Sequence, residues 1–115
     1  MIVISRGEIW FVNLNPTRGS EQAGIRPVIV FQANELNKFT NTVLAIPLTT
    51  NLRRVPLPTC VFISKGEGGL ANDSVALCHQ LRVLDKTRLQ RKIGTLSQQT
   101  LSTIESRMLF TMGII

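Results

Sequence analysis

The sequence predicts a mainly β domain, a small barrel or highly curved sheet that carries short helices and ends in one longer helix. Several short β-rich segments alternate with turn residues, and only the C-terminal segment has clear helical spacing. The chain has 115 residues, which is enough for one hydrophobic core, and its hydrophobic fraction of 43% is too high for a disordered chain. We therefore expect residues 1–115 to form a single domain.

The first strand is expected at residues 7–14, where Asn15 and Pro16 end it. Residues 17–24 contain two glycines and almost no apolar side chain, so they predict an exposed loop. Residues 26–33 form a continuous β-rich run, which is typical of a strand covered on both faces.

A short turn or helix at residues 34–39 leads to a third expected strand at residues 42–49. Because proline lacks the N–H that a sheet ladder uses, Pro47 predicts that this strand lies at an edge or is bulged near its end. A polar loop at residues 50–58 and another strand at residues 59–64 follow.

After turn residues 65–69, the segment 74–85 predicts one long strand. Its alternation from His79 onward places two sets of side chains on opposite faces, His79, Leu81 and Val83 on one and Gln80, Arg82 and Leu84 on the other. Residues 85–92 predict a short helix and an exposed basic turn, and residues 93–96 predict one more strand.

The segment from Ser97 onward predicts the longest helix, with Ser97 as its N-cap. Apolar side chains recur there at helical spacing, and we interpret them as core packing: Leu101, Ile104, Met108 and Met112.

The chain is strongly basic, with a formal net charge of +6 and a pI of about 10.4. Nine of its 13 basic residues are arginines, whose planar guanidinium binds phosphate through two parallel hydrogen bonds. This balance favours a nucleic-acid partner, although a basic protein can also be basic for solubility alone.

Other features of the sequence limit where the protein is located and what chemistry it can perform. Cys60 and Cys78 are too few and too far apart for a disulfide framework, and we expect buried, reduced thiols. The first charged side chain, Arg6, follows only five residues, which predicts no signal peptide, and no apolar run is long enough to span a membrane. We therefore expect a cytoplasmic protein.

The usual catalytic and cofactor motifs are absent from the sequence. It contains neither a GxxxxGKS phosphate loop nor a GxGxxG motif, and its single histidine, His79, cannot form a metal site with two distant cysteines. We expect no metal and no cofactor. The chain has no tyrosine and few aromatic residues, so it offers few side chains on which nucleic-acid bases could stack.

A cluster of polar groups at loops and strand ends remains as the candidate site. Glu21 lies in the first loop and Arg26 begins an apolar strand, where an unpaired charge is costly unless it faces a ligand. Thr49 and Thr50 end the third strand, and two arginines follow directly, Arg53 and Arg54. Such a set suits phosphodiester cleavage, although a structural Arg–Glu pair that holds the loop explains part of it equally well.

Several segments together resemble the MazF/PemK-type toxin family: RGEIWFVNLNPTRGSEQAGIRPVIV, AIPLTTN, LPT, NDSVALCHQLRVLDKTRL and the helix from Ser97. The similarity covers nearly the whole chain, and GSEQAGIRPV is its most specific part. It implies an SH3-like barrel, shared with the Kid and CcdB toxins, that forms a homodimer. It also implies sequence-specific cleavage of single-stranded RNA without metal, which leaves a 2′,3′-cyclic phosphate and a 5′-hydroxyl.

The resemblance also implies residue roles and a partner. Arg26 and Thr49 match the family's catalytic pair, with Thr50 as the alternative, and Glu21 matches the loop acid. Gln80 matches an RNA-contacting glutamine, and we expect further RNA contacts from Arg18, Ser20, Gln22, Thr50, Arg53, Arg54 and Arg82. An acidic, MazE-like antitoxin that folds on contact is the expected protein partner.

Two positions depart from the family pattern. Ile25 stands where some relatives have histidine, and His79 stands where relatives often have an acid. We interpret His79 as a packed or rim residue in preference to a catalytic residue. Two other functions remain open: a CcdB-like gyrase poison, suggested by the ending Met112-Gly113-Ile114-Ile115, and an RNA-binding barrel without nuclease activity.

Overall fold

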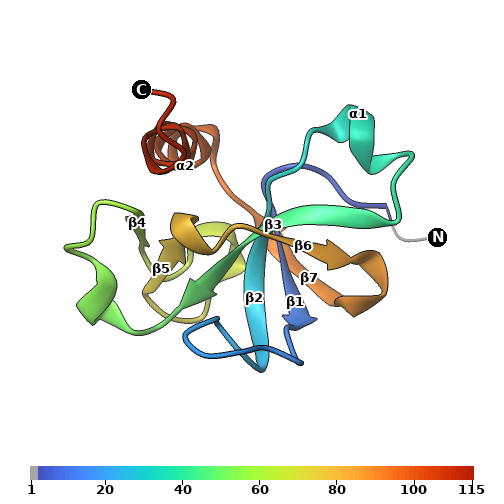
Figure 1. Ribbon diagram of the computed structural model, residues 1–115, viewed down its shortest axis with the longest axis horizontal. Coiled ribbons are helices and arrows are strands. Elements are labelled where there is room, and N and C mark those ends of the chain that lie inside the picture. The colour runs from blue at the N-terminus through green and yellow to red at the C-terminus, as the bar shows by residue number, and fades with distance from the viewer. Residues whose placement is uncertain (1–2) are drawn as a thin grey trace.

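The computed structural model describes residues 3–115, which form a curved antiparallel sheet with a helix packed against one end (Figure 1). In chain order, the strands are β1 (Glu8–Asn13), β2 (Ile25–Val30), β3 (Thr42–Thr49), β4 (Cys60–Ile63), β5 (Ser74–Leu77), β6 (Arg82–Asp85) and β7 (Leu89–Thr95). The remaining elements are two α-helices and four 3₁₀ turns: α1 (Asn34–Asn37), α2 (Gln98–Thr111), η1 (Leu52–Arg54), η2 (Glu67–Gly69), η3 (Cys78–Gln80) and η4 (Lys86–Arg88). The mainly β, barrel-like class with a C-terminal helix is confirmed.

The sheet has the order β4-β5-β3-β2-β1-β7, with β6 paired to β3 outside this path, and these pairings do not close it into a complete hydrogen-bonded barrel. β3 has β2 on one side and two successive partners on the other, β6 along Thr42–Ala45 and β5 at Leu48 and Thr49. Pro47 predicted an edge strand or a bulge near the end of the strand, and of these two alternatives the edge position is wrong. Proline is tolerated inside this sheet because Pro47 lies where the neighbour changes from β6 to β5.

Two hydrophobic clusters lie on opposite faces of the central strands. Alternate residues of paired strands point to the same face, so Ile29 and Ile46 belong to one cluster, and their neighbours Val28 and Val30 belong to the other. The first cluster includes Ile104 and Met108 of α2, and the second includes Trp10 and Leu84. The curved sheet thus packs apolar side chains on both faces, and a third, smaller cluster of Cys60, Val75 and Leu77 joins β4 and β5.

The C-terminal helix begins where the sequence predicts. The Ser97 hydroxyl accepts a hydrogen bond from the Thr100 N–H at 3.2 Å, so Ser97 is the N-cap. Leu101, Ile104 and Met108 are buried as expected, whereas Met112 lies just after the helix and is exposed. The prediction of a core role for Met112 is wrong, because this residue caps the end of the helix with its side chain exposed.

The expected single strand at residues 74–85 is two strands separated by η3. Alternation alone cannot reveal this break, because it continues on each side of the turn. His79 and Gln80 lie in the turn, so the predicted sharing of faces across residues 79–84 is wrong. Within β6 itself, Leu84 is buried and Val83 is exposed, as alternation requires.

Two other strand bounds differ from prediction. β2 ends at Val30, before the expected end at residue 33, and only its second half, Val28–Val30, is fully buried. β7 begins at Leu89, four residues before the expected start, and follows the short basic turn η4. Leu89 pairs with Val12, so β7 extends along β1 from this position.

The two cysteines are free and buried, as predicted. Burial, together with the nearby Cys60, raises the pKa of Cys78 to about 11, so this thiol stays protonated at neutral pH. No helix within residues 3–115 is both long and apolar enough to cross a membrane.

Candidate functional site

Arg26 and Thr49 lie at neighbouring strand ends on the same face of the sheet. β2 pairs with β3 through Val28 and Pro47, and the same register continued by two residues sets Arg26 opposite Thr49. Arg26 also pairs directly with Val12 of β1, which belongs to the second hydrophobic cluster. Residues opposite each other share a face, so Arg26 lies on the face of that cluster. Thr49 pairs directly with Val75 of β5, which belongs to a third, smaller cluster.

The two side chains are held differently. Arg26 is exposed, and its Nε donates to the Ala23 carbonyl oxygen at 3.1 Å. Its two terminal nitrogens have no hydrogen-bond partner within residues 3–115, so they are free to bind a ligand. Thr49 is only 9% exposed, and its hydroxyl oxygen accepts from the Asn51 N–H at 3.2 Å. Because this oxygen acts as the acceptor, its own proton remains available for donation.

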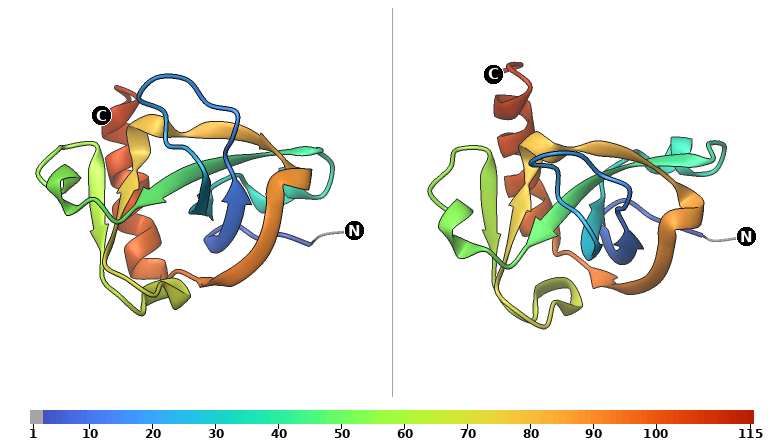
Figure 2. Two further views of the ribbon diagram at one scale, coloured as in Figure 1. Left: turned by 90° about the horizontal axis from the view of Figure 1, so that it is seen from below. Right: turned by 60° about the horizontal axis from the view of Figure 1, so that its bottom comes forward.

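The loop at residues 17–24 carries Glu21, whose carboxylate accepts from the Arg18 N–H at 2.5 Å. Gln80 of η3 holds the tip of this loop: its Oε1 accepts from the Gln22 N–H at 2.7 Å, and its Nε2 donates to the Ser20 carbonyl oxygen at 3.3 Å. The predicted loop residues and Gln80 therefore lie together, although Gln80 contacts the loop backbone. Figure 2 shows the loop arching over η3.

The turn η1 presents Arg53 and Arg54 directly after β3. Asn51 caps this turn, because its side-chain oxygen accepts from the Arg53 N–H at 3.2 Å. Arg54 lies close enough to His79 to disfavour a second positive charge there. Partial burial and this arginine together lower the pKa of His79, which favours the neutral imidazole.

His79 is a rim residue, as one of the two structural interpretations predicts. The side chain is exposed, and its Nδ1 lies 2.8 Å from the Thr59 hydroxyl at the end of the loop at residues 50–58. Arg82 differs from the other predicted contacts: it is half-buried opposite Ala45, and its Nη1 is buried without a hydrogen-bond partner in the described structure. Thr50 is exposed directly after β3.

Sequence reasoning missed three residues that shape this region: Asn51, Thr59 and Arg88. Asn51 could have been found, because asparagine before a short polar segment is a common capping residue. Thr59 and Arg88 carry no such local signal. Arg88 donates to the Asn13 carbonyl oxygen at 3.0 Å and also binds the Asn15 carbonyl oxygen, and thus fixes the start of the first loop from β7's side of the sheet.

We call Arg18, Arg26, Arg53 and Arg54 the arginine rim. None of the four is within 4.0 Å of a carboxylate within the part of the chain that the structure describes, whose ion pairs are Arg6–Glu105 and Lys92–Glu8. The acid in this region, Glu21, accepts a hydrogen bond from a backbone N–H of its own loop. The rim thus presents guanidinium groups and the Thr49 hydroxyl, which suit an anionic polymer with phosphate groups.

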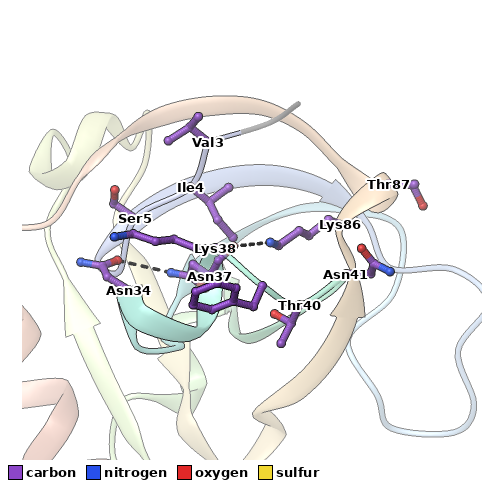
Figure 3. Close-up of a pocket in the computed structure, with 11 residues that line it drawn as sticks. Val3, Ile4, Ser5, Asn34, Asn37, Lys38, Thr40, Asn41, Lys86 and Thr87 are labelled. Atoms are coloured by element: carbon purple, nitrogen blue, oxygen red, sulfur yellow. Dashed lines mark hydrogen bonds between the residues drawn. The ribbon is translucent and has the colours of Figure 1, made fainter.

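A cavity of about 710 Å³ lies elsewhere, between the first described residues, α1 and η4 (Figure 3). Lys86 on its wall donates to the Asn37 carbonyl oxygen, and Asn37 donates to Asn34 at 3.3 Å. None of the predicted site residues lines it. The arginine rim is therefore an open surface rather than part of this cavity.

Comparison with known proteins identifies the family of this chain. Residues 5–110 match the family described as PemK-like, MazF-like toxin of type II toxin-antitoxin system. The chain belongs to this family. The match includes both strand ends that carry Arg26 and Thr49, and the two loops that carry Arg18, Arg53 and Arg54.

Individual relatives agree with this assignment. The chain is 36% identical over 112 residues to an endoribonuclease MazF of Staphylococcus epidermidis, covering 97% of this chain and 93% of the relative. The fold matches a MazF crystal structure from Deinococcus radiodurans with a TM-score of 0.83 at 24% identity, over 98% of this chain and 99% of the other. It also matches a mycobacterial endoribonuclease solved with its cognate antitoxin, with a TM-score of 0.82 at 22% identity, over 97% of each chain.

Proposed function

We propose that this chain is the toxin of a toxin–antitoxin pair and acts as a sequence-specific endoribonuclease on single-stranded RNA, mRNA included, thereby blocking translation and growth. What supports this proposal is the β2–β3 register, which, continued two residues beyond Val28 and Pro47, sets Arg26 opposite Thr49, beside an arginine rim that has no paired acid within residues 3–115. The relative of 36% identity, itself named an endoribonuclease, supports the same activity.

The proposed reaction uses the RNA's own 2′-hydroxyl as the nucleophile. Its oxygen attacks the adjacent phosphorus, the bond from phosphorus to the 5′-oxygen breaks, and a 2′,3′-cyclic phosphate and a 5′-hydroxyl result. One proton leaves the attacking hydroxyl and one is added to the departing 5′-oxygen. The nucleophile is already part of the substrate, so we propose that no metal is needed to generate it.

The residues take roles that follow from their chemistry. Arg26 has free terminal nitrogens, and a guanidinium is a poor base, so Arg26 stabilises the charge that grows on the phosphate oxygens and can donate a proton. Thr49 donates its hydroxyl proton to the same oxygens. Glu21 is the proposed acceptor of the 2′-hydroxyl proton, through the carboxylate oxygen that Arg18 does not occupy.

We further propose a homodimer that acts in the cytoplasm, where mRNA is found, and an acidic antitoxin that neutralises it. A net charge of +6 and unpaired arginines would attract an acidic, partly disordered partner over a long range. The structural relative solved with its cognate antitoxin supports such an assembly.

The decisive experiment incubates the purified protein with a mixed RNA pool in excess EDTA and maps the new ends. We expect discrete cuts with 5′-hydroxyl and 2′,3′-cyclic phosphate ends, which are lost in Arg26→Ala and retained in Arg91→Ala, a matched arginine on β7. Absence of discrete cuts, or cuts that Arg26→Ala retains, would refute the proposal. Trapped gyrase–DNA complexes with intact RNA would instead support the gyrase alternative.

A further inference from the structure

The turn η3 ties two loops of the candidate site to the core. It interrupts the segment that sequence alternation predicts as one strand, and it presents two consecutive polar side chains, His79 and Gln80. His79 contacts Thr59 at the end of the loop at residues 50–58, and Gln80 contacts the tip of the loop at residues 17–24. One short turn thus connects the two loops that carry Arg18, Arg53 and Arg54, three of the four arginines of the rim.

The base of this connection is rigid. Cys78, the first residue of η3, is 1% exposed and belongs to the first hydrophobic cluster. Its N–H donates to the Thr59 carbonyl oxygen at 3.1 Å, and the Leu81 N–H closes the turn onto the Cys78 carbonyl oxygen at 3.2 Å. A side chain that projects from η3 therefore holds its partner in a fixed position relative to the core.

Gln80 supplies the long-range hydrogen bonds of the loop tip. Both ends of its amide are used, one with the Gln22 N–H and one with the Ser20 carbonyl oxygen, so they bracket Glu21. The other hydrogen bonds of residues 17–22, within the described chain, join Arg18 to Glu21 and remain inside the loop. The base of the loop is held separately, by Gly24 with Leu14 and Asn15.

We propose that Gln80 is a positioning residue, which orders the tip of the loop at residues 17–24 and so sets how tightly and at which sequences RNA binds. The inference rests on the proposed ribonuclease function and changes the role expected for Gln80, from contacting RNA to holding the protein groups that contact it. Without Gln80, the tip must be ordered when RNA binds, and the lost conformational entropy weakens binding without changing the reacting groups.

The test compares Gln80→Met, which keeps the side-chain length and removes both hydrogen bonds, with Gln90→Met on β7 as a matched control at an exposed glutamine. Amide hydrogen exchange of the free proteins reports on loop order. We expect faster exchange confined to residues 17–24 in Gln80→Met, and no change in Gln90→Met. Gln80→Glu keeps the acceptor for the Gln22 N–H and loses the donor to Ser20, so its exchange should be intermediate.

Kinetics on RNA separate positioning from catalysis. With a single-stranded oligonucleotide that contains one mapped cleavage site, Gln80→Met should raise KM about tenfold, the usual effect of losing one or two neutral hydrogen bonds, with kcat nearly unchanged. Mapping of RNA 5′ ends should show cuts at additional sequences. Unchanged exchange in residues 17–24, or a fall in kcat at constant KM, would overturn the positioning role.

The two proposals fail in different ways. If the wild-type protein leaves RNA intact, the ribonuclease proposal fails, and the exchange experiment still decides whether Gln80 orders the loop. If the wild-type protein cleaves RNA and Gln80→Met matches it in KM and cleavage sites, the inference about Gln80 fails and the function stands. A melting temperature measured for each variant shows that the fold is intact.

Discussion

Arg26 and Thr49 differ in how firmly the fold holds their side chains. The Thr49 hydroxyl is nearly buried and held by the Asn51 backbone, so its position is fixed by the fold. The Arg26 guanidinium is exposed and anchored only at Nε, so its terminal nitrogens can adjust to a phosphate. Changes at Arg26 should therefore affect function and leave stability almost unchanged, whereas changes at Thr49 also affect the local turn.

The Thr49 hydroxyl can be tested by a pair of substitutions. Thr49→Val keeps the shape and removes the donor, so we expect kcat to fall about 100-fold, the typical effect of losing one transition-state hydrogen bond. Thr49→Ser keeps the hydroxyl and should retain most of the activity. Single-turnover cleavage of one oligonucleotide measures both. Equal activity of the valine and serine variants would show that the hydroxyl takes no part.

Glu8 is a second residue whose role is set by its surroundings, here for stability. It is 8% exposed, and its carboxylate accepts from the Trp10 indole N–H at 3.0 Å and the Ser5 N–H at 2.9 Å and pairs with Lys92 at 3.0 Å. Burial raises its pKa, but these hydrogen bonds and the Lys92 charge lower it more, so the pKa lies below the ordinary value of 4.5. The ionised form is thus favoured by folding.

The sign of this shift predicts a pH dependence. The stabilisation from Glu8 is fully present above pH 4.5 and is lost as the pH falls through the lower pKa of the folded state. Glu8→Gln should therefore lower the free energy of unfolding by about 1–2 kcal/mol at pH 7 and by less near pH 3. Urea unfolding at both pH values measures this, and an equal loss at both would contradict it.

At the scale of elements, the turn η2 and the strand β7 approach each other more closely than side chains would allow. A Cβ at Gly94 would lie 2.4 Å from the Gly68 carbonyl oxygen, and a Cβ at Gly69 would lie 2.5 Å from that of Ile93. The contact between these elements is therefore made by backbone. Gly69 also needs glycine for its positive φ of 81°, whereas Gly94 needs it for space alone.

Gly94→Ala tests this close approach. The added methyl group must push η2 away from β7, so we expect a loss of about 1–3 kcal/mol in the free energy of unfolding. Thr95→Ala, at the exposed next residue, should change stability by less than about 0.5 kcal/mol. Chemical denaturation of both variants provides the measurement, and equal stability of the two would show that η2 moves at little cost.

At the scale of the whole molecule, the distribution of charge separates acids from bases. Six of the seven carboxylates are held by backbone N–H groups or by Arg6, and 11 of the 13 basic side chains have no ion-pair partner in the part of the chain described. Because most carboxylates are bonded to nearby backbone groups, the guanidinium groups remain available to an external anion. Long-range attraction of RNA should therefore depend strongly on salt.

Salt dependence of RNA binding measures this attraction. With a 2′-O-methyl oligonucleotide, which cannot be cleaved, we expect Kd to rise steeply between 50 and 200 mM salt, because bound counterions are released. Arg54→Ala should lower the slope of log Kd against log salt by about 0.7 if it contacts one phosphate. Fluorescence anisotropy gives both slopes. A Kd independent of salt would contradict the electrostatic account.

Local patterns predicted those parts of the fold that depend on neighbouring residues. β3 at residues 42–49 and the Ser97 cap were predicted correctly, because strand propensity and capping act within a few residues. The break at η3 was not predicted, since it depends on Cys78 packing into a core formed by distant strands. The edge position expected from Pro47 failed for the same reason: which strands neighbour β3 is decided by the whole sheet.

The sequence by itself determined the mainly β class, the basic charge and, through family resemblance, which residues to examine at the site. Only the tertiary structure decided that Arg26 and Thr49 share a face and that Gln80 holds the loop around Glu21. The physical reason is separation along the chain. Strand register and the contact between residues 22 and 80 join segments that carry no local signal of one another.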